Sequence, residues 1–246
     1  MMNALTLLAL AVLLTTELAI VPQAKAAEKS YKVGVIPSAN SCPNGAQMLR
    51  ITMDTDDTNN KNTTEGNKLA IRINQYGVGF IFCIVDGKKL FPLDRSSDKP
   101  YLQYAVLKAG TTCPNGSNEF WRYFDTEDKK NKNKADGPLG PNKVNKYGIQ
   151  LFFCLFRGGN STMKDFPAAF PGTNEFGYGV FAKNSFAQSG GSGFIYTDDE
   201  GNKGNKNQMG SLDSDYNNFK EDAERIIEGG QFGTKIYLAQ VREVNP

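Results

Sequence analysis

The segment Ser41-Cys42-Pro43-Asn44-Gly45 returns 71 residues later as Thr112-Cys113-Pro114-Asn115-Gly116, and this repetition decides the fold. Three further markers return at the same spacing. They are Met53-Asp54-Thr55-Asp56-Asp57 with Phe124-Asp125-Thr126-Glu127-Asp128, Tyr76-Gly77 with Tyr147-Gly148, and Phe82-Cys83-Ile84 with Phe153-Cys154-Leu155. Four markers at one constant spacing indicate an internal duplication.

A third, degraded copy follows the second. Tyr178-Gly179-Val180-Phe181 resembles Tyr104-Ala105-Val106-Leu107, and an acidic, Asn-rich segment begins again at Asp198. The sequence therefore predicts three tandem units after an N-terminal segment. The expected division is 1–26, then β repeats at 27–100, 101–172 and 173–246.

The local patterns favour β-structure throughout these units. Apolar runs at 48–53, 69–73, 78–85 and 149–156 are rich in β-branched and aromatic residues and are bounded by Gly, Asn and Asp. We therefore predict an all-β fold of three repeats of about 70 residues. A pseudo-threefold, trefoil-like arrangement and a linear array of three small units both remain open.

One α-helix is expected in the third repeat, as an insertion that covers a sheet edge or a barrel end. Asp213 or Ser214 is placed to cap it, and Gly229-Gly230 is placed to end it. Its apolar stripe would comprise Tyr216, Phe219, Ala223, Ile226 and Ile227.

The N-terminus indicates export. Residues 4–21 are mostly apolar, and Ala24-Lys25-Ala26 follows them as a small-x-small triplet. This pattern is typical of a signal peptide cleaved after residue 26, with an uncleaved membrane anchor as the alternative. We expect an extracellular or periplasmic protein with no membrane span after signal removal.

The four cysteines are expected to pair within their repeats. The third copy lacks both cysteines together, and joint loss is simplest if Cys42 bonds Cys83 and Cys113 bonds Cys154. An oxidising compartment would preserve such bridges, whereas free buried thiols are the alternative.

Composition excludes several functions. The chain has no histidine, which removes Ser-His-Asp and Cys-His catalysis and every histidine-ligated metal site. A formal net charge of +2 argues against a dedicated nucleic-acid binder.

The acidic, Asn-rich segment is the repeated site candidate, because carboxylate and amide oxygens are the ligands that calcium prefers. The candidate metal ligands are Asp54, Asp56, Asp57, Asn62, Asp125, Glu127, Asp128, Asn133, Asp198, Asp199, Glu200 and Asn205. The alternative is a set of solvated turns, since Asp and Asn bond their own backbone and lysines are interleaved with them.

Trp121 and Tyr123 precede the second acidic segment and are candidate ligand-binding aromatics, with core packing as the alternative role. The function we expect is a secreted, non-enzymatic binding protein. One loop per repeat would contact a surface glycan or other extracellular partner, with or without calcium and with no other cofactor. The alternatives are a carboxylate-dependent glycan hydrolase, or a toxin or inhibitor acting on another protein.

Overall fold

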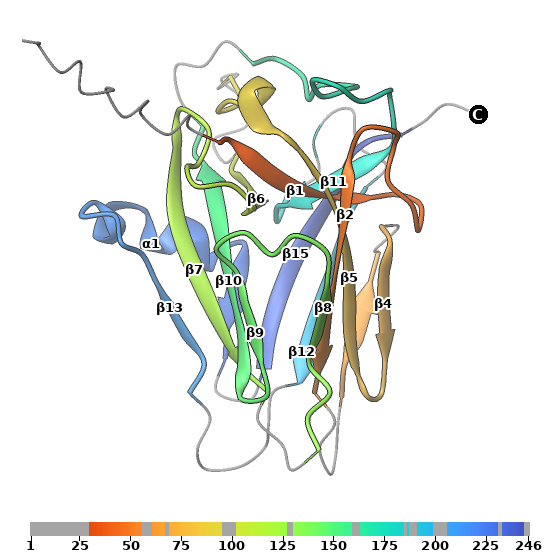
Figure 1. Ribbon diagram of the computed structural model, residues 1–246. Coiled ribbons are helices and arrows are strands. Elements are labelled where there is room, and N and C mark those ends of the chain that lie inside the picture. The colour runs from red at the N-terminus through yellow and green to blue at the C-terminus, as the bar shows by residue number, and fades with distance from the viewer. Residues whose placement is uncertain are drawn as a thin grey trace, which may run out of the picture.

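The computed structural model describes residues 30–55, 61–66, 69–94, 102–126, 130–158, 163–184, 186, 191–198, 206–230 and 233–243. These residues form fifteen β-strands in one curled sheet, with antiparallel pairing, and one α-helix (Figure 1). The all-β fold predicted from the sequence is thus confirmed.

The strands of the first third of the chain are β1 (Lys32–Pro37), β2 (Gln47–Asp54), β3 (Thr63–Glu65), β4 (Ile71–Asn74) and β5 (Gly77–Asp86). Those of the middle third are β6 (Tyr104–Lys108), β7 (Ser117–Asp125), β8 (Lys134–Asp136), β9 (Lys143–Asn145) and β10 (Gly148–Phe156). The remaining strands are β11 (Tyr178–Phe181), β12 (Gly191–Asp198), β13 (Gln208–Gly210), β14 (Ile227–Gly229) and β15 (Gly233–Arg242).

One pairing scheme occurs three times along the chain. The long strand β5 pairs with β1, β2 and β4, β10 pairs with β6, β7 and β9, and β15 pairs with β11, β12 and β14. The short third strands cross over cyclically, because β8 pairs with β2, β13 with β7 and β3 with β12. Strands β1, β6 and β11 pair with one another. This scheme fits the three predicted units, whose boundaries stay a prediction.

The long strands form a wall around one core. Figure 1 shows β1, β6 and β11 crossing the upper end of the molecule, with the long strands running down from them. Along β2, Leu49, Ile51 and Met53 are buried while Arg50 and Thr52 between them are exposed, so one face of the strand fills the interior. A second apolar cluster lies between β1, β6, β11 and the segments that connect the thirds of the chain.

Both predicted disulfides are confirmed. Cys42 bonds Cys83 with a Cα–Cα distance of 5.4 Å, and Cys113 bonds Cys154 with a Cα–Cα distance of 5.5 Å. Each bridge ties the turn before β2 or β7 to the C-terminal half of the long strand in the same third of the chain.

The helix is shorter than the sequence pattern predicts. It is α1 (Tyr216–Glu224), and the expected extension to Gly229-Gly230 is wrong because Ile227–Gly229 forms β14 on the edge of β15. Its N-cap is Asp215, which makes no side-chain capping bond. Asp213 instead accepts the Asp215 N–H through Oδ1 at 3.0 Å, which steadies the turn before the helix.

The N-terminal prediction of a signal peptide at 1–26 lies outside the described residues. Within the part of the chain that the structure describes, no helix has the length and apolar character needed to cross a membrane.

Candidate binding face

Three of the predicted site residues share one structural position. Asp54 is the last residue of β2, Asp125 the last of β7 and Asp198 the last of β12. These strands hold equivalent places in the pairing scheme, so the three aspartates mark the points where the acidic segments leave the wall.

Asp54 is fixed by two consecutive residues of the neighbouring third of the chain. Its N–H donates to Asn133 Oδ1 at 2.8 Å, and its Oδ2 accepts the backbone N–H of Lys132 at 2.6 Å. We call this reciprocal pair an Asp–Asn clamp. It joins the end of β2 to the segment that enters β8.

The same clamp occurs twice more, in cyclic order. The Asp125 N–H donates to Asn207 Oδ1 at 2.9 Å, and the Lys206 N–H donates to Asp125 Oδ2 at 2.6 Å. The Asp198 N–H donates to Asn62 Oδ1 at 2.9 Å, and the Lys61 N–H donates to Asp198 Oδ2 at 2.7 Å. Each third of the chain therefore holds the next one at this end of the wall.

The clamp asparagine also fixes a turn in its own part of the chain. Asn62 Nδ2 donates to Thr55 Oγ1 at 2.6 Å and to the Asn74 carbonyl at 3.1 Å. Asn133 Nδ2 makes the same bonds to Thr126 Oγ1 at 2.6 Å and to the Asn145 carbonyl at 2.9 Å. One amide thus links the acidic segment, the adjacent strand end and the hairpin turn.

These contacts show how the described members of the predicted metal set are used. Asp54, Asp125, Asp198, Asn62 and Asn133 all bond to the protein itself. Among the described residues, no group of three or more acidic or cysteine side chains is arranged to hold a metal ion. The other candidates lie outside the described residues: Asp56, Asp57, Glu127, Asp128, Asp199, Glu200 and Asn205.

The two predicted ligand-binding aromatics cover glycines of neighbouring strands. A Cβ at Gly210 would come within 2.6 Å of Trp121 Cζ2, and one at Gly148 within 2.5 Å of the Tyr123 hydroxyl. Tyr123 also donates its hydroxyl to the Tyr147 carbonyl at 3.0 Å. Both rings are half-buried.

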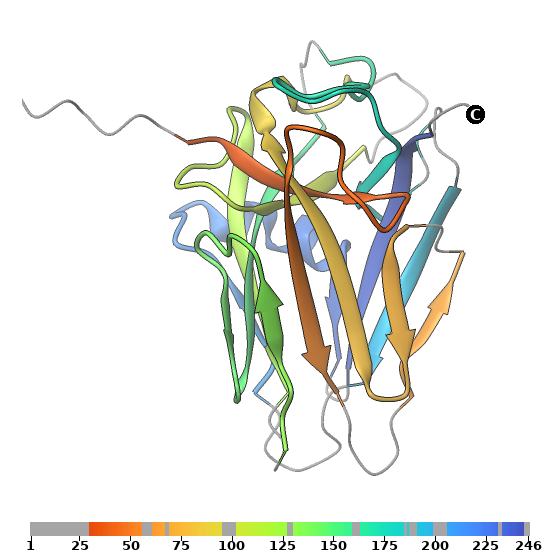
Figure 2. The same cartoon turned by 45° about the vertical axis from the view of Figure 1, so that its right-hand side comes forward.

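Two tyrosines that the site prediction omitted are more exposed. Tyr76 lies in the β4–β5 turn with 55% of its surface exposed, and Tyr147 lies in the β9–β10 turn with 51% exposed. In Figures 1 and 2 both turns lie at the lower end, opposite β1, β6 and β11. The repeated Tyr-Gly pair in the sequence could have pointed to these two tyrosines, but the sequence analysis uses it only as evidence for the duplication.

Each exposed tyrosine is mounted on a fixed turn. The N–H groups of Tyr76 and Tyr147 donate to Asn74 Oδ1 and Asn145 Oδ1, both at 2.8 Å, which is an Asx-turn. The carbonyls of Asn74 and Asn145 are the ones bonded by the clamp asparagines. The clamps therefore set the positions of the turns, while the rings project into solvent beside the ends of the acidic segments.

A comparison with known proteins identifies the family of the chain. No curated protein and no solved structure gives a significant match. Residues 10–162 match the family model described as bacterial ApeC. The matched region contains both disulfides, two of the three clamp aspartates and both exposed tyrosines. Because the match spans more than half of the sequence, the chain belongs to the bacterial ApeC family.

Proposed function

We propose that the protein is an exported, non-enzymatic binding protein whose lower end contacts a surface glycan through Tyr76 and Tyr147. The observation that carries the proposal is the pair of exposed rings at equivalent turns, each beside an Asp–Asn clamp. We call this surface the tyrosine face.

Exposed aromatic rings of this kind suit a sugar. The face of an aromatic ring carries negative charge density, which attracts the weakly positive C–H groups on one side of a sugar ring. Lys146 Nζ lies 4.7 Å from the centre of the Tyr147 ring, and Tyr147 is still 51% exposed, so part of this side chain is accessible to a ligand.

Repetition also supports a binding role. Two equivalent rings on one rigid end allow two weak contacts to act together, which raises the overall avidity for a polymer that presents many copies of a sugar. Phe232-Gly233 takes the corresponding place in the third part of the sequence, although Phe232 lies outside the described residues. A hydrolase would instead need two carboxylates in differing environments around one bond, and the clamp carboxylates each bind a backbone N–H of a neighbouring segment.

Export is part of the proposal. The apolar N-terminal segment and its small-x-small triplet support a cleaved signal peptide. Two disulfides support an oxidising destination, extracellular or periplasmic. Calcium remains an optional component of the proposal, through those carboxylates of the acidic segments that lie outside the described residues.

A pull-down on insoluble polysaccharides tests the proposal. Purified protein is incubated with cellulose, chitin, xylan and bacterial cell walls, in millimolar calcium and in chelator. We expect retention on at least one of them, about tenfold weaker binding for the Tyr76→Ala/Tyr147→Ala double variant, and intermediate binding for each single variant. Leu212→Ala is the matched control, because Leu212 is 85% exposed and lies outside the tyrosine face.

Two results would reject the proposal. One is failure of the wild-type protein to bind any of these polymers in either buffer. The other is undiminished binding by the double variant when its melting temperature equals that of the wild type.

A further inference from the structure

The two turns of the tyrosine face differ in one residue. The first has the sequence Asn74-Gln75-Tyr76-Gly77 and the second Asn145-Lys146-Tyr147-Gly148. Both turns are fixed by the same hydrogen bond, in which the tyrosine N–H donates to the asparagine Oδ1 at 2.8 Å. The residue before the tyrosine is exposed in both turns. The second turn therefore presents a cation beside its ring, whereas the first presents a neutral amide at the equivalent position.

The charge of Lys146 is accessible to a ligand. Its Nζ lies 4.7 Å from the centre of the Tyr147 ring. No carboxylate oxygen of the described residues lies within 4.0 Å of this nitrogen. An aromatic ring attracts an ammonium group through the negative charge density on its face, but it does not neutralise the charge. A ligand that contacts the exposed part of Tyr147 therefore meets a positive charge at the same ring.

A second cation accompanies each turn. Arg72 on β4 and Lys143 on β9 hold equivalent positions in the repeats, and both are exposed. Ile73 and Val144 beside them pack against the core, so the alternation of a strand directs Arg72 and Lys143 outward. Neither cation forms an ion pair with a carboxylate in the part of the chain that the structure describes.

The clamp aspartates add little exposed negative charge to this surface. Asp54 is opposite Gly77 in the pairing of β2 with β5, and Asp125 is opposite Gly148 in the pairing of β7 with β10. Each clamp aspartate thus lies at the base of one turn. They are 6% and 5% exposed, and each accepts a backbone N–H. The cations of the turns are therefore more accessible to a ligand than these carboxylates are.

We propose that the glycan bound by the tyrosine face is acidic, and that Lys146 selects its anionic sugars. The sugar would pack on Tyr147, and its carboxylate, sulfate or phosphate group would accept a charge-assisted hydrogen bond from Lys146 Nζ. The turn that carries Gln75 would bind a sugar through Tyr76 without this preference. The inference rests on the proposed function, because it requires that the two tyrosines contact the glycan.

Biolayer interferometry on immobilised polymers tests the inference, using the full chain. The first matched pair is polygalacturonate and its methyl ester, since esterification removes the carboxylate charge and keeps the sugar backbone. The second pair is dextran sulfate and dextran, which separates recognition of a sulfate from recognition of a carboxylate. We expect at least one acidic polymer to bind about tenfold or more tightly than its neutral counterpart, with an advantage that shrinks as sodium chloride is added.

Exchanging the one residue that differs between the turns tests the role of Lys146. Lys146→Gln gives the second turn the sequence of the first and should weaken binding to the acidic polymer about two- to fivefold, the range for one exposed ion pair. Gln75→Lys gives the first turn the sequence of the second and should strengthen the same binding by a similar factor.

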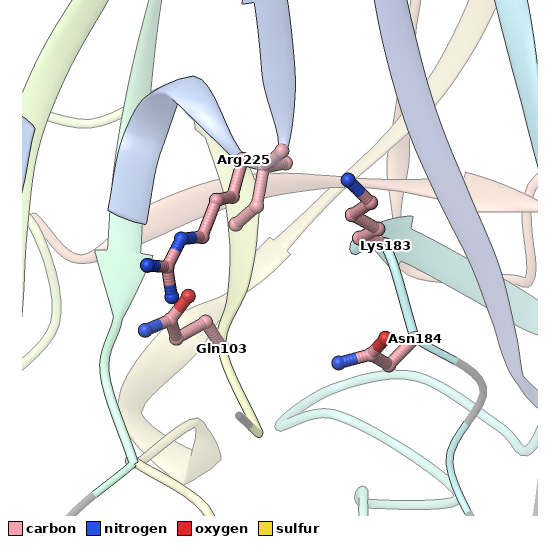
Figure 3. A pocket seen from close by; sticks show the side chains of 5 residues that line it. Gln103, Lys183, Asn184 and Arg225 are labelled. Carbon is pink, nitrogen blue, oxygen red and sulfur yellow. The ribbon is translucent and has the colours of Figure 1, made fainter. Parts of the chain in front are cut away.

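Lys183→Gln is the matched control. Lys183 is also an exposed lysine whose Nζ lies near a tyrosine ring, at 4.9 Å from the centre of Tyr237. It follows β11 at the upper end of the wall, where it lines a pocket together with Gln103 and Arg225 (Figure 3), away from the tyrosine face. The substitution removes the same charge from the protein and should leave the affinity within about 1.5-fold of the wild type.

Three results would overturn the inference: no binding to either acidic polymer, equal binding to each acidic polymer and its neutral counterpart, or a Lys146→Gln affinity that matches that of Lys183→Gln. Equal binding to both members of a pair that is lost in Tyr76→Ala/Tyr147→Ala would overturn this inference alone. Undiminished binding of an acidic polymer by the same double variant would instead reject the proposed function on which the inference rests.

Discussion

Replacing Asn133 by alanine tests the Asp–Asn clamps at the residue where most of their bonds meet. In the wild type, Asn133 Oδ1 accepts the Asp54 N–H, and Asn133 Nδ2 donates to Thr126 Oγ1 and to the Asn145 carbonyl. Alanine retains the backbone at this position but removes all three hydrogen bonds.

The expected cost follows from where the abandoned partners lie. Asp54 is 6% exposed and Thr126 is 1% exposed, so neither group has ready access to water, whereas Asn145 is exposed. A buried polar group left without its partner costs about 1–3 kcal/mol. Two such groups give a loss of about 2–6 kcal/mol in the free energy of unfolding, and the bond at Asn145 adds little because water can replace it. For a chain of this size, that corresponds to a fall in melting temperature of roughly 4–24 °C.

Urea unfolding followed by circular dichroism measures this loss, with Asn62→Ala and Asn217→Ala run in parallel. Asn62 makes the same set of bonds in the first part of the chain and should show a similar loss. Asn217 is an exposed residue of α1, where alanine should be neutral or slightly stabilising. The clamp account is refuted if Asn133→Ala and Asn62→Ala unfold within about 0.5 kcal/mol of the wild type.

Three further perturbations have defined outcomes. Replacing Cys113 and Cys154 together by serine opens a loop with a sequence separation of 41 residues. The chain-entropy model predicts a loss of about 4 kcal/mol in the free energy of unfolding, which calorimetry would measure as a lower melting temperature. An unchanged melting temperature would contradict this prediction. Hydrogen bonds from the Asp215 N–H, and then from the Asn118 amide, hold the pKa of the Asp213 carboxyl below its usual value. The ionised carboxyl therefore stabilises the folded protein fully above about pH 3.9, and this stabilisation is lost as the pH falls through the lower folded-state pKa. Asp213→Asn should therefore flatten the pH dependence of the urea midpoint below about pH 4 and cost under about 1 kcal/mol at pH 7, and an equally steep acid dependence would disprove the assignment. Gln240 is buried, and its Oε1 accepts no hydrogen bond among the described residues. Gln240→Leu should therefore leave the free energy of unfolding within about 1 kcal/mol of the wild type in the same urea assay. A loss above about 2 kcal/mol would show that the amide is needed.

Local features of this fold could be predicted from the sequence because their causes are local. The alternation at Leu49, Ile51 and Met53 has the two-residue period of a half-buried strand, and the structure has β2 there. The pairing of Cys42 with Cys83 spans 41 residues and is not local, but comparison of the repeats predicts it because the third copy lacks both cysteines together.

The C-terminal end of α1 differs from the prediction because it is set by a contact with a strand that is distant in the sequence. Ile226 and Ile227 continue the apolar spacing of α1, so periodicity alone extends the helix to Gly229. In the structure Ile227 pairs with Ile236 of β15, and this long-range partner converts the segment to a strand. Tertiary pairing overrides a helical pattern of only one turn.

The site prediction found the strand ends but not their partners. Asp54, Asp125 and Asp198 are the last residues of their strands, and each bonds a Lys-Asn pair from another third of the chain. The amide equivalent to Asn62 and Asn133 in the last third is Asn207, one residue further from its aspartate than in the other two segments, and the prediction had placed Asn205 there. The cyclic crossing of the short third strands creates these contacts, and no pattern within one segment encodes it.

Fluorine NMR on protein labelled with 3-fluorotyrosine tests the tyrosine face most directly. The chain has ten tyrosines, and single Tyr→Phe variants assign the signals of Tyr76, Tyr147 and the buried Tyr104 and Tyr178. On titration with oligosaccharides from the polysaccharide retained in the pull-down, the signals of Tyr76 and Tyr147 should shift with a common dissociation constant, while those of Tyr104 and Tyr178 stay in place. Binding with shifts at other tyrosines and none at Tyr76 and Tyr147 would contradict the account.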